Sequence, residues 1–117
     1  MKNYVAVFLG SAESIRKWDG LDEKTRKEKE KQGIAAWYSW GEKNGKWIVD
    51  NGAPLGKTMV VNEKGVGSGK NEITAYTVVK AESHEAAAKL FLNHPHFSIF
   101  PGDRIEVMEC LPIPGQG

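Results

Sequence analysis

The segment at residues 4 to 9 constrains the fold most, because it is apolar on both of the faces that an extended chain presents. Its sequence, Tyr-Val-Ala-Val-Phe-Leu, is rich in β-branched and aromatic residues and is followed by a glycine and a serine, which is typical of a strand. One face is expected to carry Val5, Val7 and Leu9, and the other Tyr4, Ala6 and Phe8. A strand of this kind belongs to a sheet that must be covered on both sides.

The rest of the chain predicts an α+β order, with helical and strand-like segments in alternation. Residues 14 to 45 predict a helix with a break, in which a charged run precedes Gly33, a residue that weakens a helix by about 1 kcal/mol relative to alanine. Ser83 is a favourable N-cap for a second helix, and Pro95 follows its end. The further strands are expected at residues 57–61, 72–80 and 104–111, with a long hairpin loop at residues 62–71 and the second helix at residues 86–92.

The order β-α-β-β-α-β predicts the ferredoxin-like arrangement, a four-stranded antiparallel sheet backed by two helices. Two helices cover only one face of such a sheet. The open face is expected to carry an apolar patch formed by Tyr4, Ala6, Phe8, Tyr76, Val78 and Met108. A monomer does not normally expose such a patch, and burying each of these side chains stabilises by roughly 1.5–3 kcal/mol. The sequence therefore predicts a homodimer that forms through the open sheet face.

Composition indicates one globular domain and excludes several classes of protein. Of the 117 residues 40% are hydrophobic, and we expect one domain at residues 1–112 followed by a flexible tail at residues 113–117. A formal charge of +1 gives no attraction for nucleic acid or for an anionic membrane surface. Cys110 is the single cysteine, so an internal disulfide is excluded. The apolar runs are too short to span a bilayer and no signal peptide is recognised, so we expect a cytoplasmic protein.

The glycine-rich segment at residues 65 to 70 invites comparison with a phosphate-binding loop. The spacing does not match, because Asn71 follows Lys70 where a serine or threonine is needed, and a strand rather than a helix is expected next. A flexible hairpin tip is the preferred interpretation, and a mobile flap over a pocket is the alternative.

Two histidines flank a proline at the end of the second helix. His94 and His96 are too few to hold a metal without further ligands nearby, and neither a metal nor a cofactor is predicted. Histidine titrates near neutral pH, so His94 is the candidate catalytic acid or base. A structural role for His94, as a hydrogen-bonded helix terminator, is the preferred interpretation.

Aromatic residues are dense around the end of the first helix. Ile34, Trp37, Tyr38 and Gly41 fall on one helical stripe, and Trp40 lies beside it. Too few basic residues accompany these rings for base stacking on a nucleic acid. We therefore expect the rings to form core and pocket wall, with a ligand pocket between the sheet and this helix lined by Trp37, Trp40, Tyr76 and His96.

Segments spread over nearly the whole chain match the pattern of a known family. They are the strand at residues 4–9, the helix carrying Trp37, Tyr38 and Trp40, the turn at residues 51–55, the helix entry at residues 81–87, His94-Pro95, and the closing strand Gly-Asp-Arg-Ile-Glu-Val at residues 102–107. With these segments the chain resembles the YCII-related family, which includes proteins with a DGPF motif. The resemblance implies a dimeric α+β barrel.

The chain departs from the family pattern at the catalytic positions. Some members resemble lyases or dehalogenases that use a His–Asp dyad with the histidine in the first helix, and here that helix contains no histidine. The Asp-Gly-Pro-Phe stretch is also absent. The catalytic pair of the family therefore has no counterpart in this sequence.

Three functions remain open on the sequence alone. The first is a dimer that binds a small, aromatic molecule in the pocket just described. The second is a cofactor-free lyase, isomerase or monooxygenase with His94 as acid or base. The third is a structural or regulatory dimer without a pocket.

Overall fold

The computed structural model describes residues 1 to 115, and the expected tail at residues 113–117 extends into two residues outside this part. Its elements are β1 (Lys2–Leu9), α1 (Ala12–Asp19), α2 (Glu23–Lys43), the 3-10 turn η1 (Gly45–Trp47), β2 (Ile48–Pro54), β3 (Thr58–Asn62), β4 (Gly65–Gly69), β5 (Ile73–Ala81), α3 (His84–Lys89), α4 (Pro95–Ser98) and β6 (Arg104–Glu109). Among residues 1 to 115, none of the helices combines the length and the apolar character needed to cross a bilayer.

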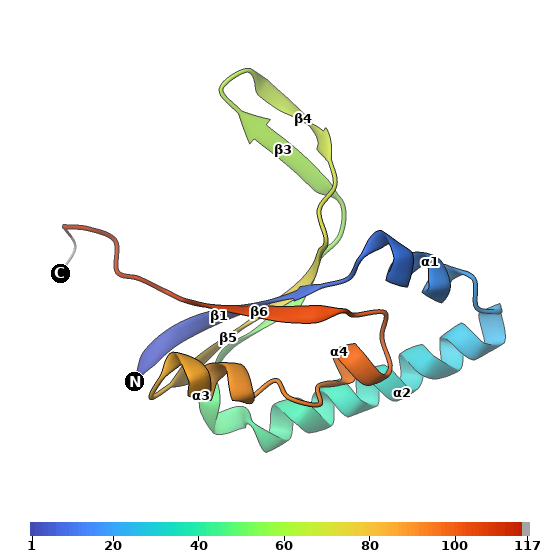
Figure 1. Ribbon diagram of the computed structural model, residues 1–117, viewed down its shortest axis with the longest axis horizontal. Helices are drawn as coiled ribbons and strands as arrows, with labels where there is room; N and C mark the ends of the chain where they lie inside the picture. The colour runs from blue at the N-terminus through green and yellow to red at the C-terminus, as the bar shows by residue number, and fades with distance from the viewer. Residues whose placement is uncertain (116–117) are drawn as a thin grey trace.

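Four strands form one antiparallel sheet in the order β2-β5-β1-β6. Helices α2, α3 and α4 lie on one side of this sheet, as Figure 1 shows. The expected α+β class, with a four-stranded antiparallel sheet and helices, is therefore confirmed. The strand order is compatible with the ferredoxin-like arrangement.

The assignment of side chains to the two faces of β1 was wrong. Tyr4, Ala6 and Phe8 were expected on the open face, but they lie under the helices and are no more than 2% exposed. Val5 and Val7 take their place on the open face, since Val5 pairs with Val78 and Met108, and Val7 pairs with Tyr76. Of the predicted open-face set, Tyr76, Val78 and Met108 are placed correctly. Because both faces of β1 are apolar, alternation alone could not distinguish them; the large rings fill the space beneath the helices.

The second strand of the sheet was also misplaced. β2 runs through residues that read as a turn in the sequence, and the segment expected to pair in the sheet, residues 57–61, lies elsewhere. Gly52 has a φ of 69°, and a Cβ there would lie 1.8 Å from the carbonyl oxygen of Tyr76. Only glycine fits this irregular contact with β5, and the strand is at the edge of the sheet, where Pro54 is also tolerated.

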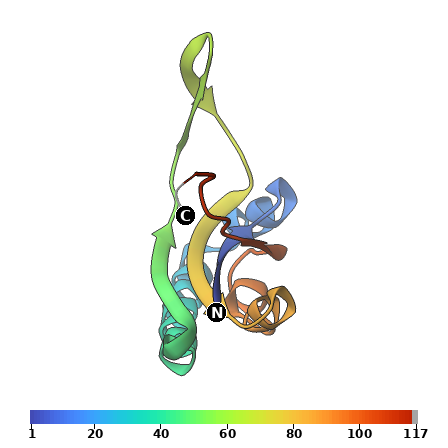
Figure 2. The ribbon, with the colours of Figure 1, turned by 90° about the vertical axis from the view of Figure 1, so that its left-hand side faces the viewer.

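Strands β3 and β4 form a separate two-stranded hairpin, here named the arm (residues 58–69). The arm stands clear of the rest of the molecule in both ribbon views (Figures 1 and 2). The segment at residues 65–70 was predicted as a loop at a hairpin tip; residues 65 to 69 are instead the second strand of the arm.

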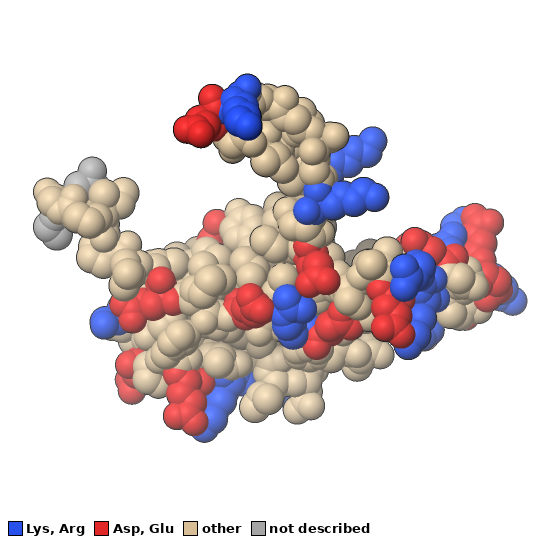
Figure 3. Space-filling view, turned by 45° about the horizontal axis from the view of Figure 1, so that its top comes forward, with Lys and Arg blue, Asp and Glu red and all other residues tan. Residues whose placement is uncertain are grey.

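The predicted helix at residues 14 to 45 is broken, as expected; the break is at Gly20, and Gly33 lies inside α2. The charged first half of α2 is mostly exposed, and pairs such as Glu23 and Lys27, 3.0 Å apart, lie on its surface. Acidic and basic side chains are interspersed on the face shown in Figure 3. This mixture presents no single-sign surface for a polyanion on that face.

Candidate functional site

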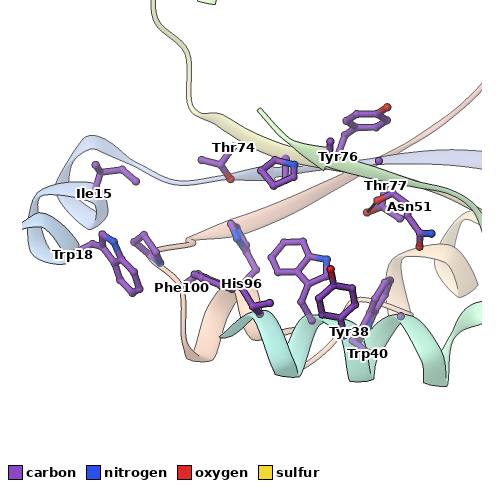
Figure 4. A pocket seen from close by; sticks show the side chains of 18 of the residues that line it. Ile15, Trp18, Tyr38, Trp40, Asn51, Thr74, Tyr76, Thr77, His96 and Phe100 are labelled. Carbon is purple, nitrogen blue, oxygen red and sulfur yellow. Dashed lines mark hydrogen bonds between the residues drawn. The ribbon is translucent and has the colours of Figure 1, made fainter. Parts of the chain in front are cut away.

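A cavity of about 850 Å³ lies between the sheet and the helices α1 and α2 (Figure 4). Strands β2 and β5 form one wall, and the segment that joins α4 to β6 closes one end. The aromatic residues that border the cavity are Trp18, Trp37, Tyr38, Trp40, Tyr76 and Phe100. Its volume is within the range of pockets that hold small molecules, and its lining is predominantly apolar, as in such pockets.

Helix α2 supplies most of the aromatic wall. The predicted stripe of Ile34, Trp37, Tyr38 and Gly41 faces the cavity, because residues spaced by three and four share one side of a helix. Trp40 is fixed more tightly than the others: its indole Nε1–H donates to the carbonyl of Leu90 at 3.1 Å, and its ring stacks on Phe91. The ring of Trp40 is therefore held in place before any ligand arrives.

A glycine in the middle of α2 makes room for the ring at the end of the cavity. Gly33 is buried, and a Cβ at this position would lie 2.4 Å from Cζ of Phe100. The Phe100 ring thus lies directly on the helix backbone and contacts the ring of Trp37, with ring centroids 5.8 Å apart. Glycine at position 33 allows this close approach, because any side chain there would overlap the Phe100 ring.

Helix α1 brings Ile15 and Trp18 to the cavity and is fastened at its N-terminus. Ser11 caps the helix, and the carboxylate of Asp103, at the start of β6, accepts hydrogen bonds from the Ser11 amide and the Ser14 hydroxyl. The hydrogen bond from Ser14, followed by those from Ser11, lowers the pKa of Asp103 to about 2. The carboxylate therefore stays charged at neutral pH and holds α1 against β6.

His94 lies behind the cavity wall rather than on it. The ring is fully buried, caps α4 by accepting the His96 amide N–H on Nδ1 at 3.0 Å, and is packed between the rings of Phe8, Trp37 and Trp40. Burial, and then the charge of His96, lowers the pKa of His94 to about 3. His94 is not among the residues that line the cavity. It caps the start of α4, whereas α3 already ends at Lys89, so the helix-terminating role expected for it is not observed.

His96 borders the cavity although its ring is almost entirely buried. Its Nε2 lies 3.0 Å from the carbonyl oxygen of Leu9 and 3.1 Å from that of Arg104. Burial lowers the pKa of His96, against the opposing effect of these two carbonyls. The neutral ring carries its proton on Nε2, because both neighbours are acceptors, and so Nδ1 is left as a hydrogen-bond acceptor.

The remaining polar lining comes from the sheet and the helix ends. The hydroxyls of Thr74 and Thr77 donate to backbone carbonyls, at 3.0 Å to Phe8 and 3.2 Å to Asn51. The charged residues that border the cavity are Asp19 and Glu42, and neither lysine nor arginine is among the lining residues. Any electrostatic bias of the cavity is therefore negative.

All four residues predicted to bind a ligand border this cavity, but one contributes differently from the others. Trp37, Trp40 and His96 lie on its walls, whereas the ring of Tyr76 points away from the helices, toward the open face (Figure 4). The prediction missed Trp18 and Phe100. The spacing of Ile15 and Trp18 on one side of a helix was a usable signal for the former. Phe100 comes from a connection between elements, where no periodicity marks it.

No three side chains of His, Cys, Asp or Glu come together as a metal site within residues 1 to 115.

Comparison with known proteins finds similarity at the level of structure. No model of a protein family matches the chain, and no curated protein matches its sequence. Among solved structures, the chain is similar to the 5-chloro-2-hydroxyhydroquinone dehydrochlorinase TftG from Burkholderia phenoliruptrix AC1100, in complex with 2,5-dihydroxybenzoquinone. The TM-score is 0.52 with 15% sequence identity, over 90% of this chain and 89% of the other. At this identity the similarity extends to the fold alone.

Proposed function

We propose that this protein binds a small planar molecule in the cavity between the sheet and α1 and α2. The observation that carries the proposal is the set of five aromatic residues that the helices and the α4–β6 connection contribute to the lining of a space of about 850 Å³. Aromatic rings bind one another by stacked or edge-to-face contacts, which favour a flat, apolar ligand. The fold of TftG, which was solved with a quinone, supports a small-molecule site in an architecture of this kind.

The charge of the lining narrows the class of ligand. Asp19 and Glu42 are exposed carboxylates at the border of the cavity, and no basic side chain lines it. A cationic group over the indoles gains from the negative face of each ring, whereas an anionic group meets repulsion from the rings and the carboxylates. The preferred ligand is neutral or cationic, with His96 as the buried polar contact.

The test uses three ligands of nearly the same shape that differ in charge: benzamidinium, benzamide and benzoate. In isothermal titration calorimetry at pH 7 and low salt, we expect benzamidinium and benzamide to bind at least tenfold more tightly than benzoate. Trp37→Ala weakens all three, because it removes wall area, and Glu42→Gln narrows the gap between cation and anion. Trp47→Ala, outside the lining, is the matched control. Absence of binding by all three, or tightest binding of benzoate, would contradict the proposal.

The enzymatic alternative keeps one supporting observation, the imidazole of His96 at the cavity wall. His94, the residue first considered as the acid or base, is shielded by Trp37 and Trp40. A cofactor-free reaction would therefore depend on His96. Turnover of a bound aromatic or dicarbonyl compound that is lost in His96→Asn, with binding retained, would establish this function over simple binding.

We propose in addition that the chain forms a twofold dimer through its open sheet face, the assembly implied by the resemblance of its sequence to the YCII-related family. Val5, Val7, Val78 and Met108 on that face support this assembly, because together they form an apolar surface that the helices leave uncovered. Membership of that family, the dimeric α+β barrel and a cytoplasmic location stay predictions.

A further inference from the structure

The two faces of the arm differ sharply in what they present. Paired residues of a hairpin share one face, so Met59 with Ser68 and Val61 with Val66 lie on the same side. Met59, Val61 and Val66 are 64%, 74% and 69% exposed, respectively. These three side chains form a continuous apolar strip, here named the arm strip, with no cover in the single chain.

The opposite face of the arm has side chains from β3 alone, those of Thr58, Val60 and Asn62. Gly65, Gly67 and Gly69 occupy every second position of β4 and therefore share this side. The side chain of Val60 lies across it, so close that a Cβ at Gly69 would be 2.3 Å from a Val60 methyl carbon. The apolar side chains of the arm are thus concentrated on the arm strip, which is unusual for a hairpin exposed to water on both faces.

The whole molecule is more extended than a compact chain of its length. Its radius of gyration is 16.1 Å, against about 13 Å expected for a globular domain of this size. Its extents are 52, 44 and 18 Å. The arm accounts for much of this shape, and a two-stranded hairpin on its own is marginally stable in water.

The arm rises on the side of the sheet that faces away from the helices, which is the side of the open face (Figures 1 and 2). The extent of 44 Å is the vertical direction of Figure 1, and a helix layer with its sheet fills roughly 20 Å of it. A second sheet packs about 10 Å from the first. A copy of the chain packed on the open face would therefore lie alongside the arm, within reach of its side chains.

We infer that the arm clasps a second copy of this chain, with the arm strip packed against the body of that copy. This inference rests on the proposed dimer through the open face. Twofold symmetry makes the contact twice, once from each arm, so its effect on association is doubled. A net charge of only +1 gives little repulsion between two copies.

A second role for the arm, as a lid over its own cavity, is an outcome that the test separates from the first. The arm leaves the sheet after Pro54, which borders the cavity, and rises on the side of the sheet that faces away from α2 (Figure 1). A lid would change ligand affinity at a fixed oligomeric state. A clasp changes the oligomeric state itself.

The experiment measures the dimer dissociation constant by sedimentation velocity over a range of protein concentrations. Val61→Asp and Val66→Asp place a charge on the arm strip, and Val60→Asp, on the glycine face of the same hairpin, is the matched control. A fourth variant replaces residues 58–69 by Asn-Gly, which closes the short gap between Lys57 and Lys70. Near-ultraviolet circular dichroism verifies that the sheet and the aromatic wall remain folded in each variant.

We expect Val61→Asp, Val66→Asp and the armless variant to raise the dissociation constant at least tenfold, while Val60→Asp stays within about twofold of the unmodified chain. If the unmodified chain is dimeric and all four variants associate equally well, the clasp is wrong and the open-face dimer stands. If the unmodified chain is a monomer at every concentration, the dimer and the clasp both fail. If association is unchanged but benzamide affinity changes in the armless variant, the arm is a lid.

Discussion

Two histidines two residues apart have different roles because of where their rings point. The ring of His94 enters the core and caps α4, whereas that of His96 reaches the cavity and two backbone carbonyls. Among the residues described, the Nε2 atom of His94 is a buried side-chain nitrogen without a hydrogen-bond partner. The proline between them fixes the turn but does not reveal from sequence which ring faces the ligand.

The buried position of His94 predicts a loss of stability in acid. In the unfolded chain a histidine titrates near pH 6.5, whereas folded His94 stays neutral until about pH 3. The unfolded chain binds the additional proton between these values, so the free energy of unfolding falls as pH is lowered, by up to about 1.4 kcal/mol per pH unit for this group. His96, whose pKa is also lowered, acts in the same direction.

Urea unfolding of His94→Asn tests this effect, because asparagine can cap α4 but does not titrate. Between pH 6 and pH 4 we expect the free energy of unfolding of the variant to fall less steeply than that of the unmodified chain. The two slopes should differ by up to about 1.4 kcal/mol per pH unit, the contribution of one proton. Above pH 7.5 the difference between the two proteins should be constant, which serves as the control. Parallel curves over the whole acid range would contradict the assignment.

At the scale of elements, the two glycines of α2 differ in their surroundings: Gly33 packs against a neighbouring ring, whereas Gly41 has open space around it. An alanine at Gly33 would meet the Phe100 ring at 2.4 Å, whereas nothing lies within 4 Å of a Cβ at Gly41 on the same helix. We expect Gly33→Ala to destabilise by about 1–3 kcal/mol through overpacking, despite the better helix propensity of alanine. Gly41→Ala should instead stabilise by up to about 1 kcal/mol.

Thermal and urea unfolding of Gly33→Ala and Gly41→Ala test this expectation, because the two variants carry the same substitution at different positions of one helix. Equal effects of the two substitutions would mean that Phe100 moves away freely and that its contact with α2 does not shape the cavity.

The sequence predicted best those elements whose hydrophobic periodicity is clear without knowledge of their tertiary contacts. The aromatic stripe of α2 and the strands β1, β5 and β6 have clear periodicity. β2 does not, because Asn51, Gly52 and Pro54 are turn-forming residues that become a strand only when β5 offers a partner. Residues 57–61 were predicted as a strand, close to β3, but β4 was missed for a related reason. Its glycines read as a loop, and their spacing of two, which places them on one face, was not used.

At the scale of the whole molecule, one sheet face is covered and the other is not. The number of helices predicted correctly that they cover only one face of the sheet, but Tyr4, Ala6 and Phe8 were placed on the wrong face. The physical reason is that both faces of β1 are apolar, so either could have met the helices. The predicted association surface therefore remains, with Val5 and Val7 in place of those three residues.

A charge in the middle of that surface should separate the copies. Val78→Lys places an ammonium opposite Val5 on the open face, and two such charges would be buried in a twofold dimer. We expect sedimentation velocity to show a particle of about 12.9 kDa for this variant at concentrations where the unmodified chain has twice that mass. Leu92→Lys, at an exposed apolar residue on α3's side of the molecule, is the control and should leave association unchanged. A lone 12.9 kDa species for the unmodified chain at micromolar concentration would rule out the assembly.

The composition of the cavity wall has a practical consequence. Three of the four tryptophans, Trp18, Trp37 and Trp40, border the cavity, and Trp47 lies outside it with the Lys46 ammonium over its ring. Ultraviolet-excited emission from this protein is therefore weighted toward the cavity, and a compound that displaces water there alters the spectrum. The Trp47→Phe variant would remove the remaining background, so that unlabelled chemical libraries could be screened by intrinsic fluorescence alone.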